Sequence, residues 1–350
     1  MKMKSVYCYM LAGLMLSASS CSSWLSEDDA PVMSYDYYET EAGVNAAITA
    51  AYGFLRWGVG GERFDVLTEL GTDLFTEGED GSNRESYNKY ATQLNPDDGI
   101  LYEMWENHYK GISDANIAMQ KIRDSQDLLE SVKIQSYAEM QFIRAYLYFD
   151  LVQQFGRIPL VTEGSFEIRT DFKRAPIADV YNVIISDLRN AAENLPEKAS
   201  VLGRATRYSA AHLLAKVYLT RGSAVKDARG QKATDMDSTL YYAEQVINSG
   251  AYALQENFSS LWDIKNQGNS EAVFAVQFTT EPMFNGDGNK QHLYWLSWYE
   301  DQPGMLRDIE NGRPYRRHVA TKKTMDDLFD RLHDSRFYKS FKWGSTMQIM

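Results

Sequence analysis

Four aromatic side chains lie close together in the segment HLYWLSWYEDQPGM, residues 292–305, with Asn289, Gln291 and Glu300 beside them. Sugar rings present flat C–H faces that stack on aromatic rings, and their hydroxyl groups pair with amide and carboxylate side chains. If the segment is an exposed loop, it is a candidate carbohydrate platform; the alternative is that its rings form core or pack on a partner protein. The four rings are Tyr294, Trp295, Trp298 and Tyr299.

A second candidate surface lies in residues 73–98, the later part of a long irregular segment over 57–98 that is rich in Gly, Asp, Asn and Glu. A segment of this length without regular structure is often functional in a compact domain. Its amide and ring side chains suit a polar, flat ligand, and we expect three of them to form a second wall of the site. They are Asn83, Tyr87 and Tyr90.

The usual marks of catalysis are missing from the chain. The five His residues form neither an HExxH motif nor a pair four residues apart, and G-x-S-x-G and P-loop motifs do not occur. The segment GVGGER at 58–63 lacks the third glycine of a dinucleotide fingerprint. Acid pairs such as Asp73 and Glu77 are expected by chance among 48 acidic residues. The sequence therefore predicts a protein that is not an enzyme and needs no cofactor.

Metal binding and nucleic-acid binding are not expected either. The segment NGDGN at Asn285–Asn289 resembles the start of a calcium loop, but Lys290 and Leu296 stand where Gly and Glu are required. A plain turn is the favoured interpretation, so no metal site is predicted. The formal net charge of −12 repels phosphate backbones, which argues against a nucleic-acid partner.

The N-terminus has the pattern of a bacterial lipoprotein signal. Lys2 and Lys4 precede an apolar run over 6–16, and small residues lead directly to Cys21. We expect residues 1–20 to be the signal peptide, Cys21 to carry the lipid and residues 21–40 to form an acidic tether. An ordinary secretory signal with a chance cysteine is the alternative. Later stretches are too short and polar to span a bilayer, so membrane contact is expected through the lipid anchor only.

Most of residues 41–350 shows helical periodicity. Apolar residues recur every three to four positions, and Gly156 followed by Pro159 ends one helix in the expected order. The succession predicts a mainly α fold, an array of helix pairs of the tetratricopeptide type with a few short strands and long irregular loops at 57–98 and 281–318. EAVFAVQFT, 271–279, is predicted to be a buried strand. The helices are expected at 99–123, 131–155, 176–194, 207–222 and 237–249.

Two long segments resemble signatures of the SusD/RagB family of nutrient-binding surface lipoproteins. MWENHYKGISDANIAMQKI, 104–122, is similar to the W-x-x-x-Y-x-x-I-x-x-A-N helix of the family, and AEMQFIRAYLYFDLVQQFGRIPLVTE, 138–163, to its A-E-x-x-F-x-R-A signature. Trp105, Tyr109 and Arg144 stand out in these motifs, but their helical spacing favours a structural role. Family members run on through further helices, so the resemblance predicts that this SusD-like domain is C-terminally truncated.

The resemblance implies a non-catalytic binder on the outer face of the outer membrane of a Gram-negative bacterium. Such a protein captures an oligosaccharide or polysaccharide and delivers it to a TonB-dependent, SusC-like outer-membrane barrel. Two alternatives stay open: a different nutrient such as a peptide, or a helical scaffold subunit of the transporter complex that has no ligand of its own.

Overall fold

The computed structural model describes residues 40–340, apart from 81–83, 92–93, 166–168, 226–228, 282, 284–285, 287, 302, 308 and 310–311. The predicted positions Cys21, Asn83 and Asn285 lie outside the described residues. Helices dominate, which confirms the predicted fold class. The long helices are α2 Glu41–Gly53, α6 Gly99–Asp124, α7 Glu130–Phe155, α8 Ile177–Asn194, α9 Arg207–Gly222 and α10 Asp235–Asn248.

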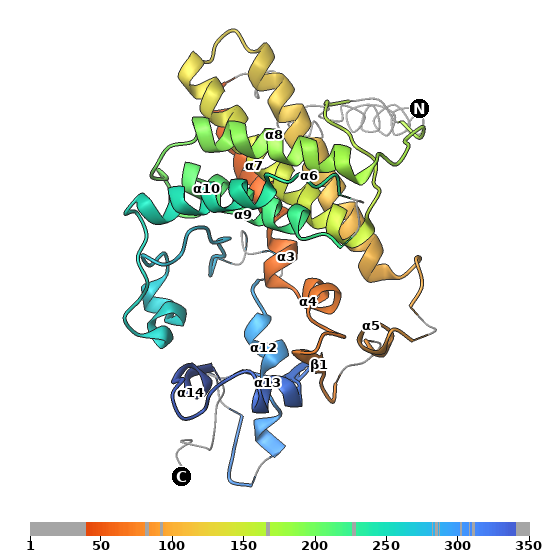
Figure 1. Cartoon of the computed structure of the whole chain (residues 1–350), viewed down its shortest axis with the longest axis vertical. Helices are drawn as coiled ribbons and strands as arrows, with labels where there is room; N and C mark the ends of the chain where they lie inside the picture. Colours follow the sequence, from red (N-terminus) through yellow and green to blue (C-terminus); the bar gives the residue numbers. More distant parts are fainter. Residues whose placement is uncertain are drawn as a thin grey trace, which may run out of the picture.

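From α6 to α10, each helix packs on the next one along the chain, and α2 lies against α6 and α7. Figure 1 shows this helical array as one lobe of the molecule. Its core consists of the apolar stripes that the periodicity predicted, and Phe142, Tyr148 and Tyr181 are among its largest fully buried side chains. Packing of each pair against its sequence neighbours is typical of helical repeat proteins.

Polar caps at the ends explain why the helices begin and end where they do. The Asp98 side chain accepts a hydrogen bond from the Ile100 N–H at the start of α6. Thr206 forms a reciprocal capping box with Ser209 at the start of α9. After α7, Gly156 adopts a positive φ of 68°, which glycine reaches without steric cost.

Buried hydrogen bonds hold the segment that follows α7 in place. Many of them come from side chains of the two sequence motifs. The Arg144 guanidinium donates to Asp187 on α8 at 2.8 Å and to the Thr162 carbonyl at 2.9 Å. The Tyr109 hydroxyl donates to the Pro159 carbonyl at 2.7 Å, and Trp105 packs edge-on against Phe155. These contacts agree with the structural role predicted for Arg144, Trp105 and Tyr109.

The two segments predicted to be irregular contain short elements and meet each other. The first holds α3 and α4 with β1 and α5, and the second holds α12 and η5, followed by β2 and α13 (Figure 1). In Figure 1 the orange and blue parts of the chain lie together below the helical array. The bounds are α3 Arg56–Gly60, α4 Glu62–Thr68, β1 Phe75–Glu77, α5 Glu85–Lys89, α12 Gln291–Trp295, η5 Tyr299–Asp301, β2 His318–Ala320 and α13 Lys322–Asp326.

The prediction of a strand at 271–279 is wrong. These residues pair with no strand in the described part of the chain, where the one sheet consists of β1 and β2. Their apolar side chains pack on helices instead: Phe274 lies edge-on to Phe142 of α7, and the Arg56 guanidinium lies over the Phe278 ring. The remaining elements are η3 Phe258–Trp262, η4 Ile264–Asn266 and α14 Arg336–Ser340.

Candidate functional site

The antiparallel pairing of β1 with β2 holds the candidate site together. Phe75 is opposite Ala320 and Glu77 is opposite His318, and the Gly78 N–H donates to the Arg317 carbonyl at 2.9 Å. A methyl group on Gly78 would lie 2.0 Å from the Arg316 carbonyl oxygen, so the two backbones approach as only glycine permits. The junction therefore brings together the two segments that the sequence marked as candidate ligand surfaces.

The second support is a buried carboxylate, Glu62 of α4, which is 5% exposed. It accepts hydrogen bonds from Arg84 Nε at 3.2 Å and Nη2 at 3.3 Å, and it also accepts one from Arg317. Arg84 precedes α5 and Arg317 precedes β2. One acid thus connects three short elements, and two cations compensate its burial.

Aromatic rings form a continuous row across this junction. Phe75 of β1 meets Trp295 of α12 edge-on, with ring centroids 4.8 Å apart. The ring centroids of Trp295 and His318 are 5.0 Å apart. Tyr294 stacks on Tyr315, with ring centroids 5.7 Å apart and 27° between the ring planes. The Arg317 guanidinium lies over both tyrosine rings. We call these five rings the aromatic row.

The structure divides the four predicted rings of 292–305 into two kinds. Tyr294 is 9% exposed and Tyr299 is 4% exposed, and the Tyr299 hydroxyl donates to the Gly312 carbonyl at 2.8 Å. Both rings support the loop from inside, so neither offers an open face to a ligand. Trp295 and Trp298 are half-buried, and Trp295 Nε1 donates to Gln291 at 3.1 Å. Of the four predicted residues, only these two tryptophans are not buried.

Tyr87 and Tyr90 of the first segment also take different positions. Tyr87 is buried with Val66, Leu70 and Ile100, and its hydroxyl donates to Asp98. Tyr87 therefore attaches α5 to the start of α6. Tyr90 is 71% exposed and has a positive φ of 50°, which is unusual for a residue other than glycine. A strained backbone that presents an open ring is typical of binding sites.

Hydrogen bonds to the Asn88 side chain place Tyr90 relative to the aromatic row. The Asn88 side-chain oxygen accepts from the Gly71 N–H, the Thr76 hydroxyl and the Glu77 N–H, at 3.1 to 3.2 Å. It thereby joins the end of α5 to β1, which carries Phe75. Tyr90 follows directly after α5, so its position is fixed by the strand that also holds Trp295 in place.

Besides His318, the sequence reasoning missed two members of the aromatic row, Phe75 and Tyr315. Both are half-buried and lie inside the segments that were singled out. Tyr315 stands between arginines in GRPYRR, and Arg313 and Arg317 both lie over its ring. A tyrosine with basic neighbours two residues away on both sides was the available signal, because guanidinium groups favour aromatic faces.

The comparisons with known proteins decide the family. The model of SusD-like proteins described as "starch-binding associating with outer membrane" matches residues 32–219, more than half of the chain. This chain belongs to the SusD-like family. The resemblance drawn from the motifs at 104–122 and 138–163 is therefore confirmed.

Two SusD-like relatives illustrate the extent of the match. SusD-like protein P2 of Formosa agariphila is 27% identical over 341 residues, which covers 89% of this chain and 63% of that protein. The starch-binding protein SusD of Bacteroides thetaiotaomicron is 27% identical over 176 residues, covering 50% of this chain and 29% of that protein. The chain thus spans less than two thirds of the length of these curated relatives.

A solved structure titled as a laminarin-binding SusD-like protein superimposes with a TM-score of 0.68 at 25% identity. The match covers 85% of this chain and 65% of that one. The structural match therefore covers more of the chain than residues 32–219, which the family model matches.

Two ionisable groups are buried at the aromatic row: His318, which belongs to it, and Asp65 beside His318. Burial raises the pKa of Asp65 from 3.8 to about 6, and burial lowers the pKa of His318 from 6.5 to about 4. His318 Nε2 lies 3.8 Å from Asp65 Oδ2, and neither of these atoms has a hydrogen-bond partner among the described residues. The junction therefore contains groups that prefer to be neutral.

Replacing Asp65 with Asn is expected to stabilise the protein more at pH 7.5 than at pH 4.5. The raised pKa means that the stabilising contribution of Asp65 is fully present below pH 3.8 and is lost as the pH rises through about 6. His318 acts in the opposite sense, because its stabilising contribution is lost as the pH falls from 6.5 towards about 4. His318 is present in both wild type and D65N, so its contribution cancels in the comparison. Allowing for partial solvent contact, the difference between the two pH values should be about 1 to 2 kcal/mol.

Urea unfolding of wild type and D65N at both pH values measures this difference. A D65N effect that is the same at pH 4.5 and pH 7.5 would contradict a raised Asp65 pKa. H318N serves as the companion variant, since its effect relative to wild type should have the opposite pH dependence.

Metal sites and membrane-spanning helices were searched for among the described residues. Within 40–340, less the gaps given above, no group of three or more His, Cys, Asp or Glu side chains is arranged to hold a metal ion. The calcium-like segment is not assessed, because Asn285 and Asp287 are not among the described residues. In the same part of the chain, every helix is too short or too polar to cross a membrane.

Proposed function

We propose that this SusD-like chain binds a glycan at the bacterial surface and delivers it, chemically unchanged, to a TonB-dependent SusC-like barrel in the outer membrane. Family membership supports a binding protein associated with the outer membrane. A structural relative is titled as a laminarin-binding protein, which makes a β-linked glucan a reasonable first ligand. The observation that carries the proposal is the aromatic row at the junction of two loop segments in a member of this family.

The proposed ligand surface uses the rings that remain accessible. Trp295, Trp298 and Tyr90 offer faces on which sugar rings stack, and half-buried Tyr315 extends the row. Tyr294, Tyr299 and Tyr87 are buried, so we assign them a structural role in the two segments. Asn83 stays part of the proposal as a hydrogen-bonding partner, as the sequence suggested.

Surface attachment is proposed through Cys21, with residues 1–20 removed and 21–40 as the tether. The basic, apolar and small-residue pattern before Cys21 supports this part of the proposal. Replacing Cys21 with Ser should abolish incorporation of radiolabelled palmitate in a Gram-negative host. Incorporation equal to wild type would rule out Cys21 as the acylated residue.

Trp298→Ala is expected to weaken glycan binding about three- to tenfold while the fold is retained. The ring is half-buried and follows α12, so its loss removes a stacking face without opening the helical array. Aromatic stacking contributes about 0.5 to 1.5 kcal/mol beyond area burial, which corresponds to this change in affinity. Affinity electrophoresis in laminarin, starch and xyloglucan gels measures it.

Trp262→Ala is the matched control. Trp262 is 72% exposed in η3, outside the two segments that form the site, and its removal should leave glycan retardation unchanged. Equal retardation of W298A and wild type in a gel that retards wild type would exclude Trp298 from the site. If a wide panel of glycans fails to retard wild type, the scaffold alternative replaces glycan binding.

A further inference from the structure

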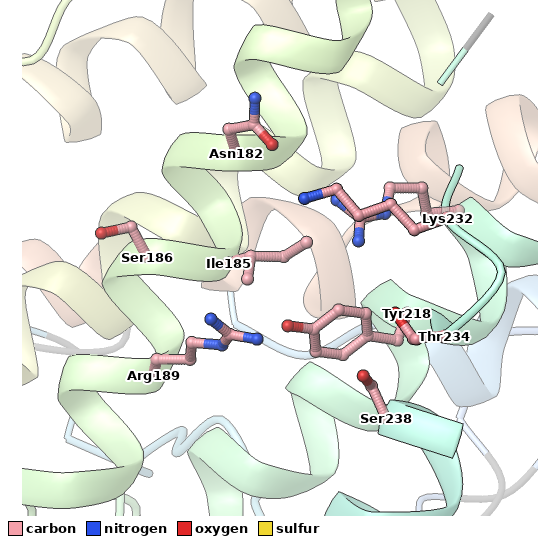
Figure 2. Close-up of a pocket in the computed structure, with 9 residues that line it drawn as sticks. Asn182, Ile185, Ser186, Arg189, Tyr218, Lys232, Thr234 and Ser238 are labelled. Atoms are coloured by element: carbon pink, nitrogen blue, oxygen red, sulfur yellow. The ribbon is translucent and has the colours of Figure 1, made fainter. Parts of the chain in front are cut away.

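A pocket of about 340 Å³ lies in the helical array, away from the aromatic row (Figure 2). It is lined by side chains of α8 and α9, by Thr234 and Ser238 at the start of α10, and by Lys232, which precedes α10. Figure 2 shows Arg189 and Lys232 reaching towards the same hollow from opposite sides, with Asn182 above it. Its volume falls within the range of small-molecule sites in proteins.

The pocket is positively charged although the protein as a whole carries −12. Its three cationic side chains are Arg189, Arg221 and Lys232. Asp235 neutralises Arg221 through a buried ion pair at 2.6 Å. Within the described part of the chain, Arg189 and Lys232 have no carboxylate partner. Two uncompensated cations on an otherwise acidic surface favour an anionic ligand.

The hydroxyl group of Tyr218 is a further hydrogen-bonding group in the pocket. The residue is 2% exposed and lines the pocket, yet its hydroxyl has no hydrogen-bond partner among the described residues. Arg189 and Arg221 lie over its ring, at 5.8 and 5.3 Å, and Figure 2 shows the hydroxyl pointing towards Arg189. Buried hydroxyl groups are almost always bonded, so this group is available to a bound acceptor.

We propose that this pocket binds an acidic saccharide unit, with the oxyanion of a sulfate ester or uronate held by Arg189, Lys232 and the Tyr218 hydroxyl. The two cations supply charge and the hydroxyl donates one hydrogen bond. Asn182, Thr234 and Ser238 line the same pocket and match sugar hydroxyl groups. The saccharide part of the ligand rests on the proposed function, whereas the oxyanion part rests on the pocket alone.

Isothermal titration calorimetry with the full chain tests the pocket, with four probes: glucose 6-sulfate, glucuronate, inorganic sulfate and glucose. At least one acidic sugar should bind, more weakly as NaCl is added, and glucose should not bind at the same concentration. The double variant R189Q/K232Q should lose at least tenfold in affinity for the acidic sugar. Y218F, which keeps the ring, should lose about three- to tenfold.

The control double variant R123Q/K265Q removes the same charge at exposed positions outside the pocket and should bind like wild type. Equal losses in both double variants would overturn the proposal, because they would reflect net charge alone. Binding of inorganic sulfate as tight as that of glucose 6-sulfate would overturn the saccharide part. No binding of any anion would overturn the whole proposal. Retardation of R189Q/K232Q in neutral glycan gels reports on the aromatic row separately, so the two proposals fail independently.

Discussion

Replacing Arg144 with Met is expected to lower the free energy of unfolding by about 3 to 5 kcal/mol. The guanidinium is buried and bonds both oxygens of Asp187 at 2.8 Å, together with Asn116 at 2.7 Å and the Thr162 carbonyl. Met fills similar volume but leaves a buried carboxylate whose remaining partner is Gln141. Burial already raises the pKa of Asp187, so without Arg144 the carboxylate would remain charged only at a high energetic cost.

Chemical denaturation of R144M measures the loss, and Arg123→Met provides the control. Arg123 pairs with Asp124 at 3.5 Å in full contact with water, and exposed pairs contribute about 0 to 1 kcal/mol. The double variant R144M/D187L should recover much of the stability, because it removes the orphaned charge. A loss for R144M no larger than for R123M would show that the buried network does not stabilise the array.

Glu62→Gln is expected to open the junction of β1 and β2 and to lower glycan affinity about tenfold or more. The variant leaves Arg84 and Arg317 facing a neutral amide in a site that is largely closed to water. Losing a buried charged partner costs about 2 to 4 kcal/mol, which is enough to free a short strand pair from its register. The helical array has its own core, so the global unfolding transition should change less than the junction does.

Hydrogen exchange separates these two effects. Amide protons at 75–77 and 318–320 should exchange faster in E62Q, while those of α7 keep their protection. Glu79→Gln is the matched control, because Glu79 pairs with Arg316 at 2.5 Å but is exposed. Unchanged exchange at β1 and β2 in E62Q would show that Glu62 does not hold the junction together.

The helical array was predictable because its signals are local. Apolar periodicity, the caps at Asp98 and Thr206 and the glycine stop at Gly156 all lie within a few residues of the element that they define. The predicted bounds of α9 agree with the structure, and those of α6, α7, α8 and α10 differ by one or two residues. Local agreement of this kind specifies helices strongly.

The two segments that meet at the candidate site could be singled out from the sequence, but their pairing and the burial of individual rings could not. Pairing of β1 with β2 joins Phe75 to Ala320, and such a contact leaves no trace in either segment alone. Composition likewise cannot separate buried rings such as Tyr299 from accessible ones such as Trp298. The strand predicted at 271–279 failed for the same reason: its alternating apolar residues found helices rather than a neighbouring strand to pair with.

The pairing of β1 with β2 has a consequence for synthesis on the ribosome. At about 5 to 20 residues per second, the chain needs roughly 10 to 50 seconds after β1 emerges to produce β2. During that delay β1 is an unpaired strand edge, a form that invites aggregation. The acidic residues Glu77, Glu79 and Asp80 follow its apolar Phe75 closely. Their like charges would keep nascent chains apart until the second strand of the junction has been made.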